Sequence, residues 1–315
     1  IPFAPAPRLF IKPVFGPAPA TPALNPAAPA PTTAPTADVI KAFIMALLNA
    51  FFWAFSSSFA CFSAAISSGV SFEANTSGLF NDKSRETIKG ATWHISQKGY
   101  ALGSHAKLDD VKNIVLGSAT HKFLFRYPSQ SINYVECHDN NVFYDKAVAA
   151  LPNTSIEEIK KRQKLATSMV ILSQGVPFIH SGQEFYRTKK GVENSYKSGD
   201  KINAINWDLV DENITDIEYL KELIRIRRKY DLFRLTAPSK IRDSVFVKIN
   251  EHGTILYQLK DEDTELIVIF KNSLVEESFE FDDKYTIIFD GVKRSRKITY
   301  KIDVNDITTY ILKRK

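Results

Sequence analysis

The sequence predicts an α/β fold followed by an antiparallel β domain, and three observations support this. Strand-like and helix-like segments alternate from about residue 71 to residue 237. After Pro238, apolar residues recur at every second position. Before residue 71, the composition is unlike that of a globular domain. We therefore expect four segments: 1–38, 39–70, 71–237 and 238–315.

The first segment, residues 1–38, contains 11 of the 15 prolines of the chain, mixed with alanine and threonine. Proline removes backbone donors, and alanine offers little surface to bury. We therefore expect this segment to be extended and disordered.

The second segment, residues 39–70, is apolar, and no charged residue occurs from 42 to 72. Such a stretch is long enough to cross a bilayer as a helix. One interpretation is a membrane anchor formed by residues 42–67, with Lys41 at its start. The other is that residues 1–70 are not a native part of the protein, for example the product of a wrong reading frame. Both interpretations remain open.

The third segment alternates between strands and helices. Residues 132–137 predict a strand, and residues 154–175 predict a helix that begins with a capping box of Thr154 and Glu157. Gly175 suits the end of this helix. Residues 176–179 predict a short buried strand. This order indicates parallel strands joined by crossover helices.

A further helix is expected over residues 215–233, with Thr215 and Glu218 as a second capping box. Apolar spacing places Ile217, Leu220 and Ile224 along one side of it. The last segment then changes to period two, with strands near 243–250, 255–260 and 266–272 and several more before the C-terminus. We expect an antiparallel β-sandwich there.

The charge pattern argues against a nucleic-acid partner. The net charge is +6, but residues 238–315 carry equal numbers of basic and acidic side chains, interspersed along the strands. Mixed signs of this kind are typical of a solvated face. The two cysteines do not form a disulfide framework, so a cytoplasmic, cell-surface or secreted location stays open for what looks like a bacterial-type protein.

The sequence gives no cofactor or metal motif. There is no glycine-rich phosphate loop, no HExxH and no CxxC. The acidic run at residues 261–265 is interpreted as a solvated turn rather than a calcium site. We therefore expect neither a cofactor nor a metal.

Polar clusters follow three of the apolar segments: one near Asn81 and Arg85, one at residues 136–141, and one at residues 180–184. Polar groups crowded at strand ends form either a site or a hydrogen-bonded network beneath a loop. Three clusters in register with predicted strands favour a site.

A neutral carbohydrate suits this inventory of side chains. His138 and Asp139 are neighbours, so on an extended strand they point to opposite faces and do not form a triad by adjacency. Carboxylates, imidazoles and amides are present, with Tyr144, Tyr186 and Trp207 as expected aromatic platforms.

The motifs resemble a known family. "INYVECHDNNVFYDK" resembles the fourth conserved region of the α-amylase clan of glycoside hydrolases, and most closely its type I pullulanases. "QGVPFIHSGQEFYRTKKGVENSYKSGDKINAINWD" resembles the eighth-strand segment of pullulanases, and "LFNDKSRETIKG" resembles the loop after the sixth strand. The resemblance covers residues 78–315.

The resemblance implies about strands 6–8 of a (β/α)8 TIM barrel, followed by a C-terminal β-sandwich. It also implies retaining hydrolysis of α-1,6-glucosidic linkages in pullulan, starch or glycogen. Asp139 matches the carboxylate that stabilises the transition state, and His138 matches an imidazole that binds sugar hydroxyls. The resemblance implies that further residues shape the substrate site: Asn140, Asp145, Arg187, Asn194, Tyr196, Asp200 and Asn203.

The nucleophile and acid motifs of the family belong upstream of Leu79, and residues 42–78 contain nothing that resembles them. We therefore expect a truncated chain that is inactive alone. One alternative is a non-catalytic glycan-binding or membrane-anchored surface module. Another is an enzyme of the same clan that is specific for α-1,4 linkages.

Overall fold

The computed structural model describes residues 78–120 and 124–315. The predicted disordered segment, the apolar segment and the proposed anchor at 42–67 all lie outside the described residues. Among the helices of the described part, none is both long enough and apolar enough to span a membrane.

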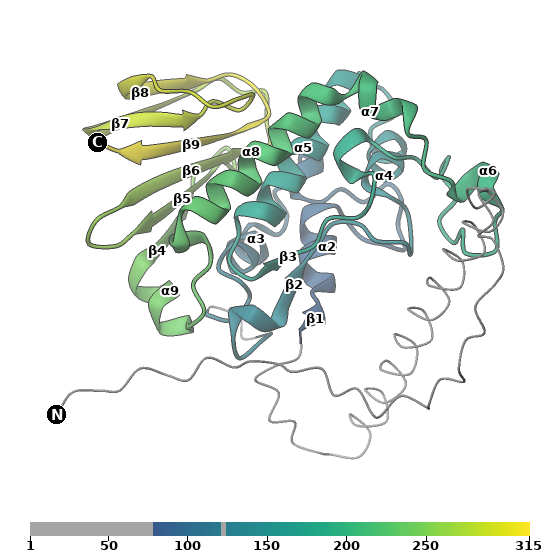
Figure 1. Ribbon diagram of the computed structural model, residues 1–315, viewed down its shortest axis with the longest axis horizontal. Coiled ribbons are helices and arrows are strands. Elements are labelled where there is room, and N and C mark those ends of the chain that lie inside the picture. Colours follow the sequence, from purple (N-terminus) through teal and green to yellow (C-terminus); the bar gives the residue numbers. More distant parts are fainter. Residues whose placement is uncertain (1–77, 121–123) are drawn as a thin grey trace, which may run out of the picture. The chain divides into compact units, whose positions relative to one another are not determined.

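A three-stranded parallel sheet forms the N-terminal part of the described structure (Figure 1). Its strands are β1 (Leu79–Phe80), β2 (Ser131–Asn133) and β3 (Val176–Pro177), with β2 in the middle. The predicted parallel pairing is therefore confirmed. The strand expected over 132–137 ends earlier, at Asn133, and the next residues form a buried loop.

The two outer strands of this sheet carry side chains that are accessible to solvent. Leu79 and Phe80 are each 39% exposed, and Val176 is 40% exposed. The prediction that residues 176–179 form a buried strand is therefore wrong at Val176. Within the described residues, β1 and β3 each pair with β2 alone, so each has an outer edge without a strand neighbour.

Eight α-helices surround or follow this sheet in the described part of the chain. They are α2 (Asp82–Ile88), α3 (Leu108–Val115), α4 (Phe143–Ala150), α5 (Ile156–Leu172), α6 (Asp200–Asn203), α7 (Asp208–Glu212), α8 (Ile214–Lys229) and α9 (Pro238–Ser244). Figure 1 shows α5 and α8 side by side, and residues of the two helices contact each other. Helix α4, between the motif loop and α5, was not expected from the sequence.

Helix α5 begins one residue later than its predicted cap. Ser155, not Thr154, is the N-cap, and its hydroxyl accepts a hydrogen bond from the Glu158 backbone N–H at 3.2 Å. The predicted box is wrong because Ser155 has the extended backbone that a cap requires. Gly175, with φ of +102°, lies just beyond the helix end as expected.

Helix α8 begins at Ile214, after Asn213 at the N-cap position, so the predicted capping box of Thr215 and Glu218 lies inside the helix. Its buried side is made by Tyr219, Leu220, Leu223 and Ile226. Ile217 and Ile224, which were predicted to lie on the buried side, are not among these residues. Ile224 is 39% exposed.

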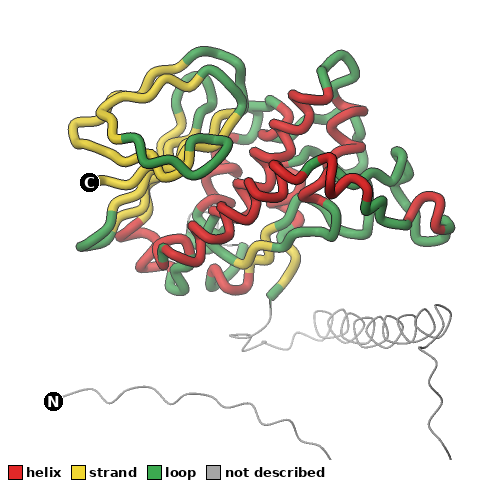
Figure 2. The backbone as a smooth tube through the Cα atoms, turned by 45° about the horizontal axis from the view of Figure 1, so that its top comes forward, coloured by secondary structure: helices red, strands yellow, loops and turns green. Residues whose placement is uncertain are grey.

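The C-terminal region forms one six-stranded antiparallel sheet, drawn with yellow strands in Figure 2. Its order is β4-β5-β6-β9-β7-β8. The strands are β4 (Val245–Ile249), β5 (Ile255–Lys260), β6 (Glu265–Lys271), β7 (Glu277–Phe289), β8 (Ile298–Val304) and β9 (Thr308–Arg314). The antiparallel pairing is confirmed, whereas the strands join in one hydrogen-bonded sheet and not in the two expected of a sandwich.

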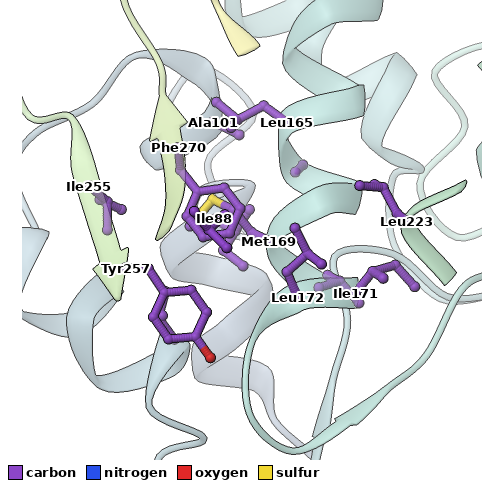
Figure 3. Packing of buried hydrophobic residues seen from close by; sticks show 14 of the residues in the cluster. Ile88, Ala101, Leu165, Met169, Ile171, Leu172, Leu223, Ile255, Tyr257 and Phe270 are labelled. Atoms are coloured by element: carbon purple, nitrogen blue, oxygen red, sulfur yellow. The ribbon is translucent and has the colours of Figure 1, made fainter. Parts of the chain in front are cut away.

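The two faces of this sheet bury different clusters. One face contributes Tyr257 and Phe270 to the main core, which also contains Leu165 and Met169 of α5 (Figure 3). The other face forms a smaller core that includes Ile269 of β6. The main core therefore contains side chains from both the helices and the C-terminal sheet.

Candidate functional site

The loop after β2 carries the motif residues and lies where the parallel strands end. The end of β2, from which this loop starts, is held from both sides, because Asn81 N donates to Ile132 O at 2.9 Å and Phe178 N donates to Asn133 O at 2.9 Å. Asn140 has φ of +61°, in the left-handed region that asparagine tolerates better than most residues. The backbone bends at residues 138–140.

His138 and Asp139 present their side chains to solvent. They are 68% and 65% exposed, and His138 Nε2 lies 3.4 Å from Asp139 Oδ2. The two groups therefore converge, although strand geometry alone would direct them apart. Their accessibility leaves both free to contact a bound molecule.

A buried lysine holds the backbone of this loop. The Lys189 ammonium group donates to His138 O at 3.1 Å, Asn140 O at 2.8 Å and Glu193 O at 2.9 Å. Burial lowers the pKa of Lys189, because desolvation disfavours the charged form, and nearby Arg187 acts in the same direction. Lys189 joins the motif loop to the segment that follows β3.

A second buried lysine binds the next carbonyl of the loop. Lys89, directly after α2, donates to Asn141 O at 2.9 Å. Burial lowers its pKa to about 8, although Glu136 partly offsets this. Two ammonium groups from distant parts of the sequence thus fix the backbone on either side of Asn140.

Asp145 is buried in the first turn of α4 and does not face solvent. Its carboxylate accepts hydrogen bonds from Thr188 Oγ1 at 2.5 Å, Lys189 N at 2.8 Å and Gly191 N at 3.1 Å. Asp145 therefore holds the segment after β3, and any effect on a ligand is exerted through that segment.

Glu136 and His180 connect the second and third polar clusters. The Glu136 carboxylate accepts from Phe143 N at 2.5 Å and lies 3.2 Å from His180 Nδ1. Glu136 is almost completely buried and His180 is half-buried. This pair is an internal network that supports the motif loop.

The first polar cluster is also a network. Asn81 caps α2 and donates to Ser118 Oγ at 3.0 Å and Ser131 Oγ at 2.9 Å. Tyr134 donates to Asp82 and accepts from Arg85 Nη1 at 2.8 Å. Of the three predicted clusters, the second, in the loop after β2, exposes both an imidazole and a carboxylate to solvent, those of His138 and Asp139.

The other predicted residues fall in the segment after β3. Arg187 donates to Asn203 O at 2.7 Å, and Asn203 Nδ2 donates to Ser195 O at 2.7 Å. Asn194 and Asp200 are exposed, and Tyr196 is 71% exposed. The segment is held by Arg187 and Asn203 and presents the other three side chains to solvent.

The three expected aromatic platforms differ in accessibility. Tyr186 is buried, with Lys160 Nζ 4.9 Å from its ring centre, so the expectation of a platform there is wrong. Tyr144 is half-buried beside it. Trp207 is 66% exposed and packs on Phe185.

Cys137, His138 and Asp139 form a group that the sequence did not indicate. Each offers one metal-ligating atom, and these atoms all lie within 4.8 Å of one another. Cys137 is mostly buried, and burial raises the pKa of its thiol. Its Sγ lies 3.8 Å from Asp139 O.

Sequence reasoning missed Lys89, Lys189 and Glu136 as supports of the loop. The sequence contains many lysines, and nothing local separates a buried one from an exposed one. Glu136 belongs to the second predicted polar cluster, but neither its support of the loop nor Cys137 as a metal ligand was predicted. A charged residue at the end of an apolar strand was the one available signal.

Comparison with known proteins gives a consistent result. No family model matches the chain. It is 41% identical over 249 residues to a pullulanase from Bacillus subtilis strain 168, covering 75% of this chain and 34% of that protein. It is 29% identical over 184 residues to the chloroplastic pullulanase 1 of Arabidopsis thaliana, covering 47% of this chain and 19% of the relative.

Solved structures agree with the sequence relatives. The crystal structure of type I pullulanase from Bacillus subtilis complexed with maltose matches with a TM-score of 0.72 and 38% identity, covering 75% of this chain and 35% of that one. A pullulanase from Anoxybacillus complexed with maltotetraose matches with a TM-score of 0.71 and 37% identity, covering 76% and 35%. The chain spans about a third of the length of these proteins.

Proposed function

We propose that this chain, which belongs to the type I pullulanases of the α-amylase clan, supplies part of an active site that hydrolyses branch linkages in α-glucans. It corresponds to about a third of the length of these enzymes. Its three parallel strands correspond to strands 6–8 of a (β/α)8 barrel within residues 71–237, and residues 238–315 correspond to the C-terminal β domain. The substrate class is pullulan, starch or glycogen, cleaved at α-1,6 linkages with retention.

The observation that supports this proposal is the exposed pair His138 and Asp139 on a fixed loop. A carboxylate held open at a strand end stabilises the oxocarbenium-like transition state, and an adjacent imidazole binds sugar hydroxyls. Two buried ammonium groups hold the loop backbone, so the pair is positioned before a sugar arrives.

Retaining hydrolysis also needs a nucleophile and an acid. The neighbouring carboxylates Asp82, Glu136 and Asp145 all accept internal hydrogen bonds. We assign neither reacting role to these three carboxylates, and residues 42–78 contain no motif for either role. We expect the chain alone to bind maltooligosaccharides weakly and to leave pullulan intact.

The experiment measures both properties on the purified 315-residue chain. Calorimetry with maltotetraose should show binding that weakens in His138→Ala and Asp139→Ala, and no reducing sugar should appear from pullulan. Release of reducing sugar that disappears in Asp139→Ala would show that the chain is an enzyme on its own. Binding unchanged in both variants would refute the assignment of the site.

A further inference from the structure

We propose that Cys137, His138 and Asp139 form a binding site for a soft divalent transition-metal ion such as Zn²⁺. The three residues supply a thiolate sulfur, an imidazole nitrogen and a carboxylate oxygen, the donor types that zinc prefers. They come from three successive residues of one loop, and all three ligating atoms lie within 4.8 Å of one another.

The distances between donors suit a tetrahedral ion. With metal bonds of about 2.1 Å to nitrogen and oxygen and about 2.3 Å to sulfur, the donors of one tetrahedron lie about 3.4–3.6 Å apart. His138 Nε2 and Asp139 Oδ2 are already 3.4 Å apart. The Cys137 sulfur lies within 4.8 Å of the other two donors and must move closer to them, which requires the thiol to leave Asp139 O.

The backbone around these donors is fixed before an ion binds. Lys189 binds the carbonyls of His138 and Asn140, and Lys89 binds that of Asn141. These carbonyls already accept hydrogen bonds from ammonium groups, so the three side chains supply the protein ligands of the proposed site. The ion therefore has three protein ligands and one open position, the pattern of zinc sites that accept a further ligand.

Selectivity follows from the donor set and from the nearby charges. Calcium takes six to eight oxygen ligands, whereas this group offers a single carboxylate. The cations Lys89, Arg85 and Lys189 interact electrostatically with Cys137 and oppose any bound cation. A thiolate that forms a covalent bond to the metal is therefore required, which favours zinc, cobalt and copper over calcium and magnesium.

A bound ion also occupies the two side chains assigned to the sugar, and this consequence rests on the proposed function. His138 and Asp139 cannot bind the metal and a glucose unit at the same time. Zinc should therefore compete with maltotetraose, and a chelator should restore sugar binding.

Titration of the metal-free chain with Co²⁺ alone tests the site. Cobalt bound in a tetrahedral site with a thiolate gives a sulfur-to-metal charge-transfer band and intense visible bands. We expect both at one equivalent in the wild-type chain, and the charge-transfer band should disappear in Cys137→Ser. His138→Gln and Asp139→Asn should keep that band and lower cobalt affinity roughly tenfold or more.

The second cysteine provides the matched control. Cys61→Ser should leave the spectrum unchanged, since Cys61 is remote in sequence from the motif. A charge-transfer band that persists in Cys137→Ser would overturn the proposal. Cobalt affinity unchanged from the wild-type chain in all three ligand variants, or an absence of cobalt binding, would overturn it as well. Far-ultraviolet circular dichroism verifies that each variant is folded. If the chain binds cobalt in this way but never binds sugar, the metal site stands and the proposed function fails.

Discussion

Lys189 is the side chain that joins the two loops at the strand ends. Its ammonium group contacts three backbone carbonyls, two in the motif loop and one in the segment after β3. A buried carbonyl without a hydrogen-bond partner destabilises the folded state. Removal of the ammonium group should therefore lower the stability of both loops.

We expect Lys189→Met to lower the free energy of unfolding by about 2 kcal/mol, because it leaves buried carbonyls without donors. Urea unfolding followed by circular dichroism measures this. The matched control is Lys190→Met, since Lys190 is exposed and should change stability by less than about 0.5 kcal/mol. Equal stability of the two variants would mean that the contacts of Lys189 contribute nothing.

The second residue-scale prediction concerns pH and Lys89. Its pKa is about 8 in the folded chain and 10.5 in the reference state. Between these values the unfolded chain binds more protons, so the free energy of unfolding rises with pH, by at most about 1.4 kcal/mol per pH unit for one group. Below pH 8 this contribution is constant.

Urea unfolding at intervals from pH 7 to 9.5 checks this, with Lys89→Met as the comparison. The rise with pH should be smaller in the variant, while Lys146, whose pKa burial also lowers to about 8, contributes equally to both chains. Above pH 10 the raised pKa values of Tyr134 and Tyr186 act in the opposite direction, which sets the upper limit of the test. If the free energy of unfolding rose equally with pH in the wild-type chain and in Lys89→Met, a contribution of Lys89 to the pH dependence would be excluded.

The roles of single residues were partly predictable. Asp139 and His138 could be selected from the sequence because the motif is local and specific. Lys89 and Lys189 could not, because their burial depends on contacts 49 to 52 residues away. Tyr186 was misplaced for the same reason, since its burial depends on packing against other elements.

At the scale of elements, the start of α5 offers a clean comparison. Ser155 makes the capping hydrogen bond and Thr154 does not. We expect Ser155→Ala to destabilise the chain by about 1 kcal/mol and Thr154→Ala to have a smaller effect. Thermal unfolding of the two variants side by side measures the difference. A larger loss of stability in Thr154→Ala than in Ser155→Ala would show that Thr154 is the N-cap, as the sequence predicted.

The strands and the two long helices, α5 and α8, could be predicted in order, but their limits and short helices such as α4 could not. Parallel pairing followed from the alternation of strands and helices, and the hairpins after Pro238 followed from period two. The buried side of α8 was misjudged because Ile224 is apolar and yet exposed. Local apolar spacing does not reveal which side a neighbouring sheet covers.

At the scale of the whole described structure, the helices and the C-terminal sheet share one core. Tyr257 and Phe270 of the sheet pack with Leu165 and Met169 of α5. Gln174 is fully buried and donates to Leu232 O at 2.7 Å and Tyr257 Oη at 2.9 Å. The change of sequence pattern near Pro238 predicted a boundary, but it did not predict how closely the two sides depend on each other.

We therefore expect the two regions to unfold together. The C-terminal sheet contains no tryptophan, and Trp93 and Trp207 precede it, so the fluorescence of the chain in a Trp53→Phe background reports on the helical region. Phe270→Ala in the sheet should shift the urea midpoint of that fluorescence, with a loss of about 3–5 kcal/mol. Phe246→Ala, at a position 52% exposed, is the control and should leave the midpoint in place. A fluorescence transition unaffected by Phe270→Ala would show two independent units.

The sheet β1-β2-β3 has a consequence for hydrogen exchange. The central strand has a partner on each side, whereas the outer strands have one partner each within the described residues. Exchange of amide protons needs local opening, and openings begin where the fewest bonds must break. Deuterium should therefore enter β1 and Val176 of β3, whose other residue is a proline without an amide proton, before it enters β2. The motif loop continues from β2, so the residues that present His138 and Asp139 extend from the slowest-exchanging strand of this sheet.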